Sequence, residues 1–179
     1  MMFHIPSLID KKVGSWIEKI PESSRPSLLW LSTVTHPVVW AVVLVGGSFV
    51  CFSVGNASLG LLWIAAAAVL PLEQILKVIF RRPRPLTMYV EAMKFRSYSF
   101  PSGHAYASVL FFSLLTVTVQ STVGGIAGNI VGAVASILVV LIGVSRVYLG
   151  AHFPTDVIAG WAIGLLVIFA YAFMRLTAM

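Results

Sequence analysis

Residues 145–156 read SRVYLGAHFPTD, a polar stretch in a half of the chain that is otherwise almost uncharged. Its chemically active side chains are Arg146, His152 and Asp156. Two other short stretches share this character: KVIFRRPRP at residues 77–85 and SFPSGH at residues 99–104. Each adjoins a long apolar run. The fold must therefore remove the apolar runs from water and keep these polar residues at their ends.

The composition is that of a membrane protein. Hydrophobic residues make up 59% and charged residues 10% of the 179 residues, whereas an average soluble domain has about 25% charged residues. Three intervals lack charge: Arg25 to Glu73, Arg96 to Arg146, and the residues after Asp156 except for Arg175. Such intervals accommodate membrane spans of roughly 20 residues each. We therefore predict one membrane-embedded domain, residues 1–179.

Turn signals divide the apolar sequence into about five spans. The predicted spans cover residues 37–54, 57–80, 102–121, 124–146 and 156–174. The apolar stretch 27–35 is too short to cross a bilayer, so it either lies at the interface or extends the first span. The second span must end before the prolines of residues 82–85, because proline lacks the N–H that a helix needs. The predicted fold class is an all-α, multi-pass transmembrane helix bundle.

Residues 1–26 are predicted to form an amphipathic segment at the membrane surface. Apolar residues recur there at helical spacing: Ile5, Leu8, Ile9, Val13, Trp16, Ile17 and Ile20. Charged residues fill the other face: Asp10, Lys11, Lys12, Glu18 and Lys19. This pattern is typical of a helix lying in the plane of the interface, with Trp16 at the level of the headgroups.

Glycines recur at four-residue spacing in the last two spans. They are Gly124, Gly128 and Gly132 in the fourth span, and Gly160 and Gly164 in the fifth. Small residues at this spacing let transmembrane helices approach closely, so these positions predict helix contacts rather than chemistry.

The net charge of +6 would be compatible with a nucleic-acid partner, but the Lys and Arg residues flank apolar runs. The lipid bilayer and anionic lipid are therefore the predicted partners, and nucleic acid is not. The single Cys51 lies in an apolar run, which excludes a disulfide framework.

Counting spans brings the polar stretches together. The second span ends at residues 77–85 and the third begins at 101–104, whereas the fourth ends at 145–146 and the fifth begins at 155–156. Successive spans cross the membrane in opposite directions, so these four ends lie on one face. The groups gathered there are cationic or can become so: Lys77, Arg84, His104, Arg146 and His152.

This set of side chains suits phosphoryl transfer, which requires stabilisation of negative charge around the phosphorus. Arginine offers forked donors that match phosphate, and lysine offers a point charge. Ser102 and Gly103 begin the third span, where unpaired backbone N–H groups favour an anion. Two histidines with one nearby acid make a poor site for a divalent metal, so we predict neither a metal nor a cofactor.

His152 and Asp156 are four residues apart. On a helical turn, Asp156 could accept a hydrogen bond from one ring nitrogen of His152. That bond would fix the tautomer and leave the other nitrogen as a nucleophile. His104 would then protonate the leaving alkoxide as the general acid. The predicted catalytic residues are thus His152, His104 and Asp156.

Written as patterns, the three stretches are K-x6-R-P, P-S-G-H and S-R-x5-H-x3-D, in this order. They resemble the signature of the type 2 phosphatidic acid phosphatase superfamily, which includes membrane lipid phosphatases, glucose-6-phosphatase and soluble vanadium haloperoxidases. The resemblance covers residues 77–156 and implies a metal-independent, bacterial-type lipid phosphatase with a phospho-histidine intermediate on His152. It also implies phosphate binding by Lys77, Arg84, Ser102, Gly103 and Arg146.

The resemblance leaves the substrate open among lipid phosphomonoesters and diphosphates. Candidates are phosphatidic acid, phosphatidylglycerophosphate, polyprenyl diphosphate and lipid A phosphate. One alternative to hydrolysis is a lipid phosphotransferase that passes the phosphate to another lipid. The other is a non-enzymatic transporter or scaffold that has kept the fold, which the presence of both His104 and His152 argues against.

Other ionisable residues near the site have more ordinary explanations. Basic residues of the second span's end and the following loop are predicted to anchor the chain to lipid headgroups: Arg81, Arg82, Lys94 and Arg96. For Arg82, contact with the substrate stays open as an alternative. Glu73 lies within the second span, one helical turn before Lys77, so an i,i+4 pair with Lys77 is favoured over a role of Glu73 in proton transfer.

The distribution of basic residues bears on the side of the membrane. Apart from the phosphate-binding positions, the catalytic face carries Lys11, Lys12, Lys19, Arg25, Arg81, Arg82, Lys94 and Arg96, whereas the opposite face carries Arg175. Lys and Arg in short loops normally stay in the cytoplasm. The sequence thus predicts a multi-pass protein of the cell's inner membrane with a cytoplasm-facing site. Many bacterial relatives instead work on the outer face and have a sixth span before the amphipathic segment.

Overall fold

The computed structural model describes residues 6–94 and 97–177, and no strand occurs among them. Ile5 and Arg96 lie outside the described residues, as does the side chain of Arg175. The elements in chain order are α1 (Leu8–Ile17), η1 (Glu22–Ser24), α2 (Arg25–Val34), α3 (Pro37–Ser53), α4 (Ala57–Val69), α5 (Leu72–Phe80), α6 (Met88–Ala92), α7 (Gly103–Thr122), α8 (Gly125–Tyr148) and α9 (Pro154–Thr177).

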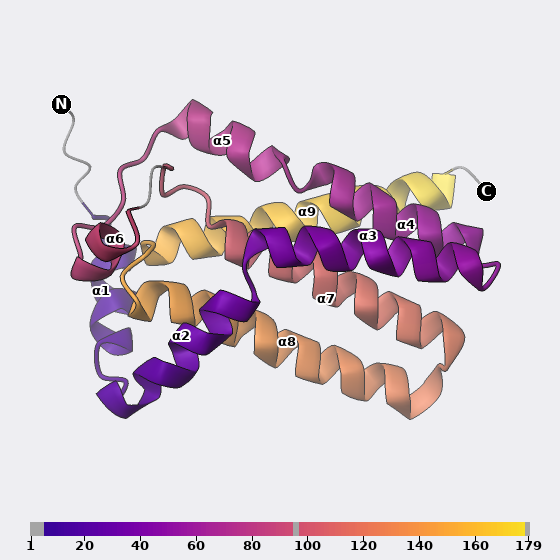
Figure 1. Ribbon diagram of the computed structural model, residues 1–179, viewed down its shortest axis with the longest axis horizontal. Coiled ribbons are helices and arrows are strands. Elements are labelled where there is room, and N and C mark those ends of the chain that lie inside the picture. The colour runs from indigo at the N-terminus through magenta and orange to yellow at the C-terminus, as the bar shows by residue number, and fades with distance from the viewer. Residues whose placement is uncertain (1–5, 95–96, 178–179) are drawn as a thin grey trace.

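The helices form a bundle long and apolar enough to cross a membrane. Four stretches of the described chain meet that requirement: Ala57–Phe80, Gly103–Thr122, Gly125–Tyr148 and Pro154–Phe173. A fifth is obtained when the bent pair of Glu22–Val34 and Pro37–Ser53 counts as one span. In Figure 1, α3, α4, α7, α8 and α9 run along the long axis, with the two chain ends at opposite ends of the molecule. The prediction of an all-α, multi-pass bundle is confirmed.

The second predicted span is one stretch divided into two helices. It breaks at Leu70–Pro71, between α4 and α5, because the proline ring has no N–H to donate to the preceding turn. Helix α5 then ends at Phe80, as the following prolines predict, and Arg81 takes a left-handed conformation with φ of 47°. This turn directs residues 82–87 across the end of the bundle.

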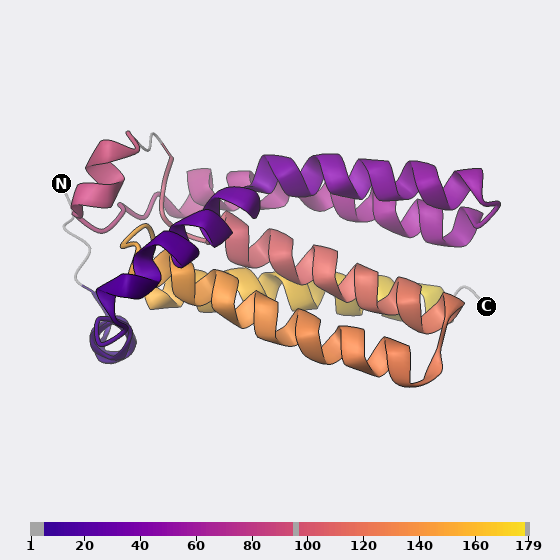
Figure 2. The ribbon, with the colours of Figure 1, turned by 60° about the horizontal axis from the view of Figure 1, so that its bottom comes forward.

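The stretch 27–35, which the sequence left between two possibilities, lies in α2 up to Val34. Helix α2 meets α3 at an angle of 49°. Thr35 and His36 form the break, and Pro37 begins the next helix at a position that suits its missing N–H. Figure 2 shows α2 leaving the direction of the bundle and crossing obliquely towards α8, with which it is in contact.

The close helix contacts predicted for Gly160 and Gly164 occur where α9 meets α7, whereas Gly124 lies in the turn before α8. A Cβ on Gly160 would lie 2.7 Å from the Ser102 carbonyl oxygen, and one on Gly164 would lie 2.8 Å from the Cβ of Val109. Gly132 on α8 similarly faces Thr116 on α7, whose methyl carbon would be 3.2 Å away. The absence of side chains at these positions lets the helices pack backbone to backbone.

The N-terminal helix has its apolar side outward and one charge inward. On α1, Leu8 is 85% exposed and Trp16 is 58% exposed, which suits a helix lying against lipid. Asp10 was expected on the water-facing side, but it is buried, with 4% of its surface exposed. The expectation for Asp10 is wrong because α1 packs against α8 and α9, and the carboxylate there binds Thr155 and Arg82.

Candidate active site

The polar stretches meet at the end of the bundle that carries α1 (Figure 1). Contacts between residues far apart in sequence join them. The side chain of Arg84 donates to the carbonyl of Ala151, and the backbone N–H of Ser102 donates to the carbonyl of Asp156, both at 2.9 Å. The convergence predicted by counting spans therefore holds in the structure.

Lys77 lies on the last turns of α5 and is paired with Glu73. The Lys77 Nζ and Glu73 Oε2 atoms are 2.6 Å apart, and both side chains are less than 10% exposed. This is the i,i+4 pair that the sequence predicts. The Glu73 carboxylate also lies against the start of α7, where a Cβ on Gly103 would be 2.9 Å from Oε1. Glu73 thus connects Lys77 with the start of α7 at Gly103.

Arg84 is held in the extended segment after α5 by several acceptors. Its Nε and Nη2 donate to the carbonyl and the hydroxyl of Ser97, each at 2.9 Å. Its Nη1 lies 3.3 Å from Nε2 of His152. Burial and then the charge of Arg146 lower the pKa of Arg84 to about 10. Arg84 therefore remains a cation at neutral pH and lies directly beside the predicted nucleophile.

Ser102 precedes Gly103 at the start of α7, and its backbone N–H is not free. It is bonded to the Asp156 carbonyl, so the expectation of an unpaired N–H at this residue is wrong. The hydroxyl is different. Ser102 Oγ is buried and has no hydrogen-bond partner among the described residues. A phosphate oxygen would supply the partner that this buried group lacks.

Ser32 of α2 covers two of the predicted functional groups. The Ser32 hydroxyl is in close contact with Nη1 of Arg146, and its carbonyl oxygen lies 3.1 Å from Nε2 of His104. All three residues are buried, with Arg146 only 1% exposed. The Tyr89 ring lies 6.0 Å from the Arg146 guanidinium carbon on another side. The cation and the predicted acid are therefore close neighbours beneath α2.

His152 lies in the loop between α8 and α9, and its two ring nitrogens have different surroundings. Nδ1 is 2.8 Å from the Ser99 carbonyl oxygen, which can only accept a hydrogen bond. Nδ1 therefore carries the proton, and Nε2 presents a lone pair towards Arg84. Burial lowers the pKa of His152 to about 4, although the contact with Asp156 opposes that shift. The ring is neutral at physiological pH.

Asp156 acts on His152 less directly than its spacing suggests. Its Oδ2 is 3.6 Å from Nδ1, which is too far for a hydrogen bond. The prediction that Asp156 accepts a hydrogen bond from one ring nitrogen of His152 is thus corrected: the acceptor at Nδ1 is the Ser99 carbonyl. Asp156 Oδ2 instead accepts from the Ser99 hydroxyl and from the Phe153 N–H at 2.9 Å. Asp156 holds the residues that hold His152.

Arg82 was predicted to be a headgroup anchor, and this is wrong. Its side chain is 8% exposed and bridges two carboxylates, with Nη1 2.5 Å from Asp156 Oδ1 and Nη2 2.8 Å from Asp10 Oδ2. Burial alone would raise the pKa of Asp10, but hydrogen bonds from Thr155 and Arg82 bring it to about 2. Both carboxylates and the guanidinium are therefore charged together inside the protein.

Sequence reasoning missed Asp10, Ser32 and Ser99 as members of the site. Ser7 and Asp10 have the spacing of a capping box, which predicts a helix start and nothing about catalysis. Ser32 lies in an apolar helix without any motif. Ser99 acts on His152 through a backbone carbonyl, which no residue type reveals. The roles of these serines depend on contacts between distant parts of the chain: Ser32 and His104 are 72 residues apart, and Ser99 and His152 are 53 apart.

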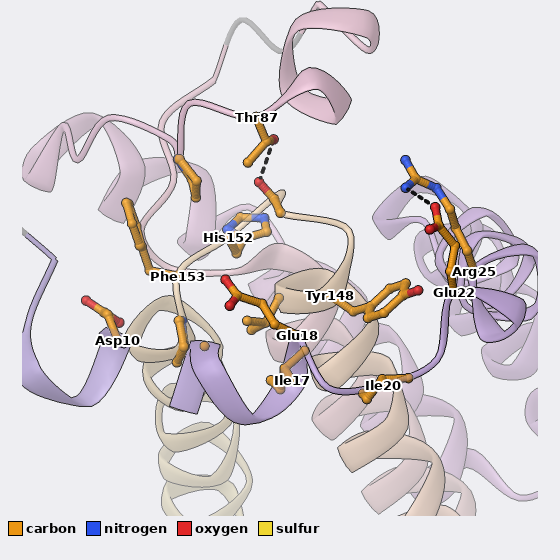
Figure 3. A pocket seen from close by; sticks show the side chains of 15 residues that line it. Asp10, Ile17, Glu18, Ile20, Glu22, Arg25, Thr87, Tyr148, His152 and Phe153 are labelled. Atoms are coloured by element: carbon orange, nitrogen blue, oxygen red, sulfur yellow. Dashed lines mark hydrogen bonds and ion pairs between the residues drawn. The ribbon is translucent and has the colours of Figure 1, made fainter. Parts of the chain in front are cut away.

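A cavity of 490 Å³ lies beside the loop between α8 and α9, and is bounded by α1, the start of α2 and the end of α8 (Figure 3). Of the predicted site residues, His152 lines it. Asp10, Glu18 and Tyr148 surround it from α1 and α8. Thr87 closes another side and donates from its hydroxyl to the Gly150 carbonyl at 3.1 Å. The cavity thus reaches the predicted nucleophile from the side of α1, whereas α2 covers Arg146 and His104.

Comparison with known proteins agrees with the motif spacing. The sequence description of the PAP2 superfamily matches residues 57–178. Phosphatidylglycerophosphatase B of Bacillus subtilis is 34% identical over 100 residues, which are 55% of this chain and 48% of that protein. Undecaprenyl-diphosphatase of Sulfolobus acidocaldarius is 34% identical over 105 residues, which are 56% and 47% of the two chains. The chain spans about half the length of these curated relatives.

The fold has a solved counterpart. The crystal structure of a transmembrane PAP2 type phosphatidylglycerolphosphate phosphatase from Bacillus subtilis superposes with a TM-score of 0.72. The superposition covers 95% of this chain and 86% of that one at 22% sequence identity. At this identity the likeness establishes the helical membrane fold.

Proposed function

The chain belongs to the PAP2 superfamily, and from this membership we propose that it is an integral membrane phosphatase that hydrolyses the terminal phosphate of a lipid phosphomonoester or diphosphate. One observation carries the proposal. The neutral ring of His152 presents Nε2 to the guanidinium of Arg84 at 3.3 Å, at the end of a membrane-spanning bundle. A nucleophile beside a fixed cation is what an anionic phosphate needs.

In the first step, the phosphate is bound by Lys77, Arg84 and Arg146, with the Ser102 hydroxyl as a further donor. The lone pair of His152 Nε2 attacks phosphorus in line with the leaving oxygen. The N–P bond forms as the P–O bond breaks, and protonated His104 gives its proton to the departing oxygen. The product is a lipid alcohol, or a lipid monophosphate when the substrate is a diphosphate.

In the second step, water hydrolyses the phospho-histidine. His104, now neutral, takes a proton from the water as it attacks phosphorus, and the N–P bond breaks. Inorganic phosphate leaves, and His152 is again neutral with its proton on Nδ1. The Ser99 carbonyl supports both steps because it keeps that proton in place, so that Nε2 remains the reactive nitrogen.

Substrate binding requires a change at α2. Ser32 is in contact with both Arg146 and His104, the groups that the phosphate and the leaving oxygen must reach. We infer that bound substrate takes the place of Ser32. The lipid tails remain in the bilayer while the phosphate enters, which fits a site at the end of apolar helices.

The names of the relatives suggest which substrates to test first. One relative is named for phosphatidylglycerophosphate and the other for undecaprenyl diphosphate. Both compounds present a terminal phosphate on a membrane-anchored lipid. Phosphatidic acid and a lipid A phosphate complete the set that the site chemistry allows.

The protein is multi-pass, and we propose that it lies in the cell's inner membrane with its site towards the cytoplasm. Basic residues on the catalytic face support this orientation, among them Lys11, Lys12, Lys19 and Arg25. Arg82 no longer counts among them, because it is buried between two carboxylates.

The decisive experiment is a phosphate-release assay with the purified protein in detergent on the four lipid classes. We expect release from at least one lipid, and loss of at least about a thousandfold in the His152→Ala variant. Gly46→Ala is the matched control, since nothing lies within 4 Å of the added methyl group. Wild-type protein that is folded but inactive on all four lipids would refute the proposal, as would full activity of His152→Ala.

Two further arms of the same assay test the mechanism and its alternative. Activity should survive excess chelator, because Lys77, Arg84 and Arg146 supply the positive charge, and vanadate should inhibit as a mimic of five-coordinate phosphorus. Activity that is lost in chelator and restored by adding Mg²⁺ would contradict the metal-independent mechanism. Phosphate release that requires a lipid alcohol acceptor, with the phosphate recovered on that acceptor, would identify a phosphotransferase instead.

A further inference from the structure

A buried carboxylate from the N-terminal helix reaches the base of the catalytic loop. Asp10 is 4% exposed, whereas its neighbours Leu8 and Ile9 on α1 are 85% and 53% exposed. A carboxylate can cap a surface helix while it stays exposed to water. Burying its charge costs free energy unless the carboxylate is paired and hydrogen-bonded. The location of Asp10 therefore calls for partners beyond its own helix.

The first set of partners lies at the start of α9. Oδ1 of Asp10 accepts from the backbone N–H of Thr155 at 2.9 Å and from its hydroxyl at 2.7 Å. The first N–H groups of a helix have no acceptor within that helix. Asp10 supplies one from another element, and Thr155 is the residue directly before Asp156.

The second partner is Arg82, which connects Asp10 to the catalytic carboxylate. Arg82 donates to Asp10 Oδ2 through Nη2 at 2.8 Å and to Asp156 Oδ1 through Nη1 at 2.5 Å. The guanidinium carbon lies 4.3 Å from the centre of the Phe153 ring. The planar fork of arginine has a fixed geometry. A carboxylate that fixes one arm of the fork therefore fixes the other arm as well.

From Asp156 the chain of contacts continues to the nucleophile. Asp156 Oδ2 accepts from the hydroxyl of Ser99. The carbonyl of the same serine lies 2.8 Å from Nδ1 of His152. A shift of Asp156 would therefore move Ser99 and alter the direction of the Nε2 lone pair.

We propose that Asp10 is a positioning residue for His152, acting through Arg82 and the start of α9 on Asp156 and Ser99. The inference rests on the proposed function for its catalytic meaning, but the geometry stands without it. An amphipathic N-terminal helix thus contributes a buried charge to the orientation of the nucleophile, although the catalytic motifs begin 67 residues later, at position 77.

The test compares Asp10→Asn, Arg82→Lys and the double variant in the purified full chain. The asparagine side chain keeps the size of the aspartate but offers a single oxygen acceptor, and the lysine side chain keeps the charge of the arginine but loses the fork. Ser7→Ala is the matched control. It removes the hydroxyl that accepts from the Asp10 N–H and so loosens the start of α1 without altering the carboxylate.

Two measurements are made on every variant. The first is kcat and KM for the lipid phosphate that the wild type hydrolyses. We expect kcat of Asp10→Asn to fall by about ten- to a hundredfold with KM within about twofold, as for other partners that orient a functional group. The second is the nitrogen NMR spectrum of the His152 ring, which reports its tautomer and surroundings whether or not the protein is active.

Support requires three results: a loss in kcat, altered His152 signals in Asp10→Asn, and no such changes in Ser7→Ala. The double variant should be no slower than the slower single variant, since both act through Asp156. Unaltered His152 signals or an unchanged kcat in Asp10→Asn would overturn the proposal. So would a double variant whose loss in kcat is the product of the two single losses, or an equal loss of kcat in Ser7→Ala. Should Asp10→Asn fail to fold, Arg82→Lys decides by the same criteria.

A wild type that is inactive on every lipid would refute the proposed function and not this inference. The ring signals would then decide alone. Altered signals in Asp10→Asn with unaltered signals in Ser7→Ala would support the positioning role. Unaltered signals in both would refute it.

Discussion

At the scale of single residues, the protonation state of His152 determines the pH range in which the proposed nucleophile is available. Burial brings its pKa to about 4, well below the usual 6.5. The folded protein therefore binds fewer protons than the unfolded chain between these two values. Any stability that depends on the neutral ring is complete above about pH 6.5 and declines as the pH falls towards 4. The nucleophile itself stays neutral down to about pH 4.

This behaviour can be measured on the ring itself. In detergent, with the signal assigned by comparison with His152→Gln, we expect the His152 ring to be neutral at pH 6 and to titrate with a pKa of about 4. A midpoint near the usual value of 6.5 would contradict the burial argument.

His104 makes a separate prediction because a general acid matters most when the leaving group is poor. His104→Ala should slow hydrolysis of a lipid phosphate by about a hundredfold or more. With p-nitrophenyl phosphate, whose phenolate leaves without help, the loss should be much smaller. Equal losses on the two substrates, measured as kcat/KM, would argue against His104 as the acid.

The motif residues could be predicted from the sequence because they are close together in it and chemically distinctive. Arg82 shows the limit. The stretch RRPRP contains three arginines, and only the path of the chain after the left-handed Arg81 decides that Arg84 meets His152 while Arg82 lies between two carboxylates. Asp10 and Ser32 were not predictable as site residues, since their partners are 145 and 114 positions away.

At the scale of helices, the contact between α7 and α9 holds the start of α7 against the start of α9. Gly160 is central to it, because any Cβ would approach the Ser102 carbonyl to 2.7 Å. Gly160→Val should force the two helices apart, displace Ser102 from Asp156, and destabilise the bundle by about 1–3 kcal/mol. Thermal unfolding in detergent measures the stability, and phosphate release measures the displacement.

The matched variant is Gly46→Val on α3. Position 46 has open space around it, so the same added volume should leave both stability and activity close to wild type. Equal destabilisation by the two substitutions would show that helix propensity, and not the contact with α7, accounts for the effect.

Hydropathy and proline placement predicted most of the helices. The third to fifth predicted spans differ from α7, α8 and α9 by a few residues, and the glycine spacing identified helix contacts at Gly132, Gly160 and Gly164 but not at Gly124. The division of the second span at Pro71 and the bend before Pro37 were not predicted, because a proline within an apolar run is compatible with either a kink or a break. The prediction that Asp10 lies on the water-facing side of α1 was wrong, because helical periodicity does not distinguish a lipid surface from a protein surface.

At the scale of the whole molecule, the direction of the helices links the chain ends to the two sides of the membrane. The site and α1 lie at one end of the bundle, and α9 carries the chain to the other (Figure 1). If the site faces the cytoplasm, as we propose, the C-terminus lies outside. A reporter fused after Met179 tests this orientation. Alkaline phosphatase activity is expected, whereas fluorescence of a fused green fluorescent protein would show that the C-terminus is in the cytoplasm and the site faces outward.

The reporter result also depends on the number of crossings. Five require that α2 and α3 together form one span. A fusion in the turn at Gly55 and Asn56, between α3 and α4, should report the opposite side from a fusion at Ile20 and Pro21, before α2. The same side at both positions would contradict the five-span arrangement.

The space beside Gly103 has a consequence for related chains. A Cβ at position 103 would lie 2.9 Å from the Glu73 carboxylate, and moving that carboxylate aside would disturb its pair with Lys77. Positions 73 and 103 should therefore covary during evolution: a chain with alanine at 103 should carry a shorter residue at 73. In this protein, Gly103→Ala should lose activity, and adding Glu73→Asp should recover part of it. Recovery by Glu73→Asp of an unrelated defect, such as Gly160→Val, would show that the compensation is not local.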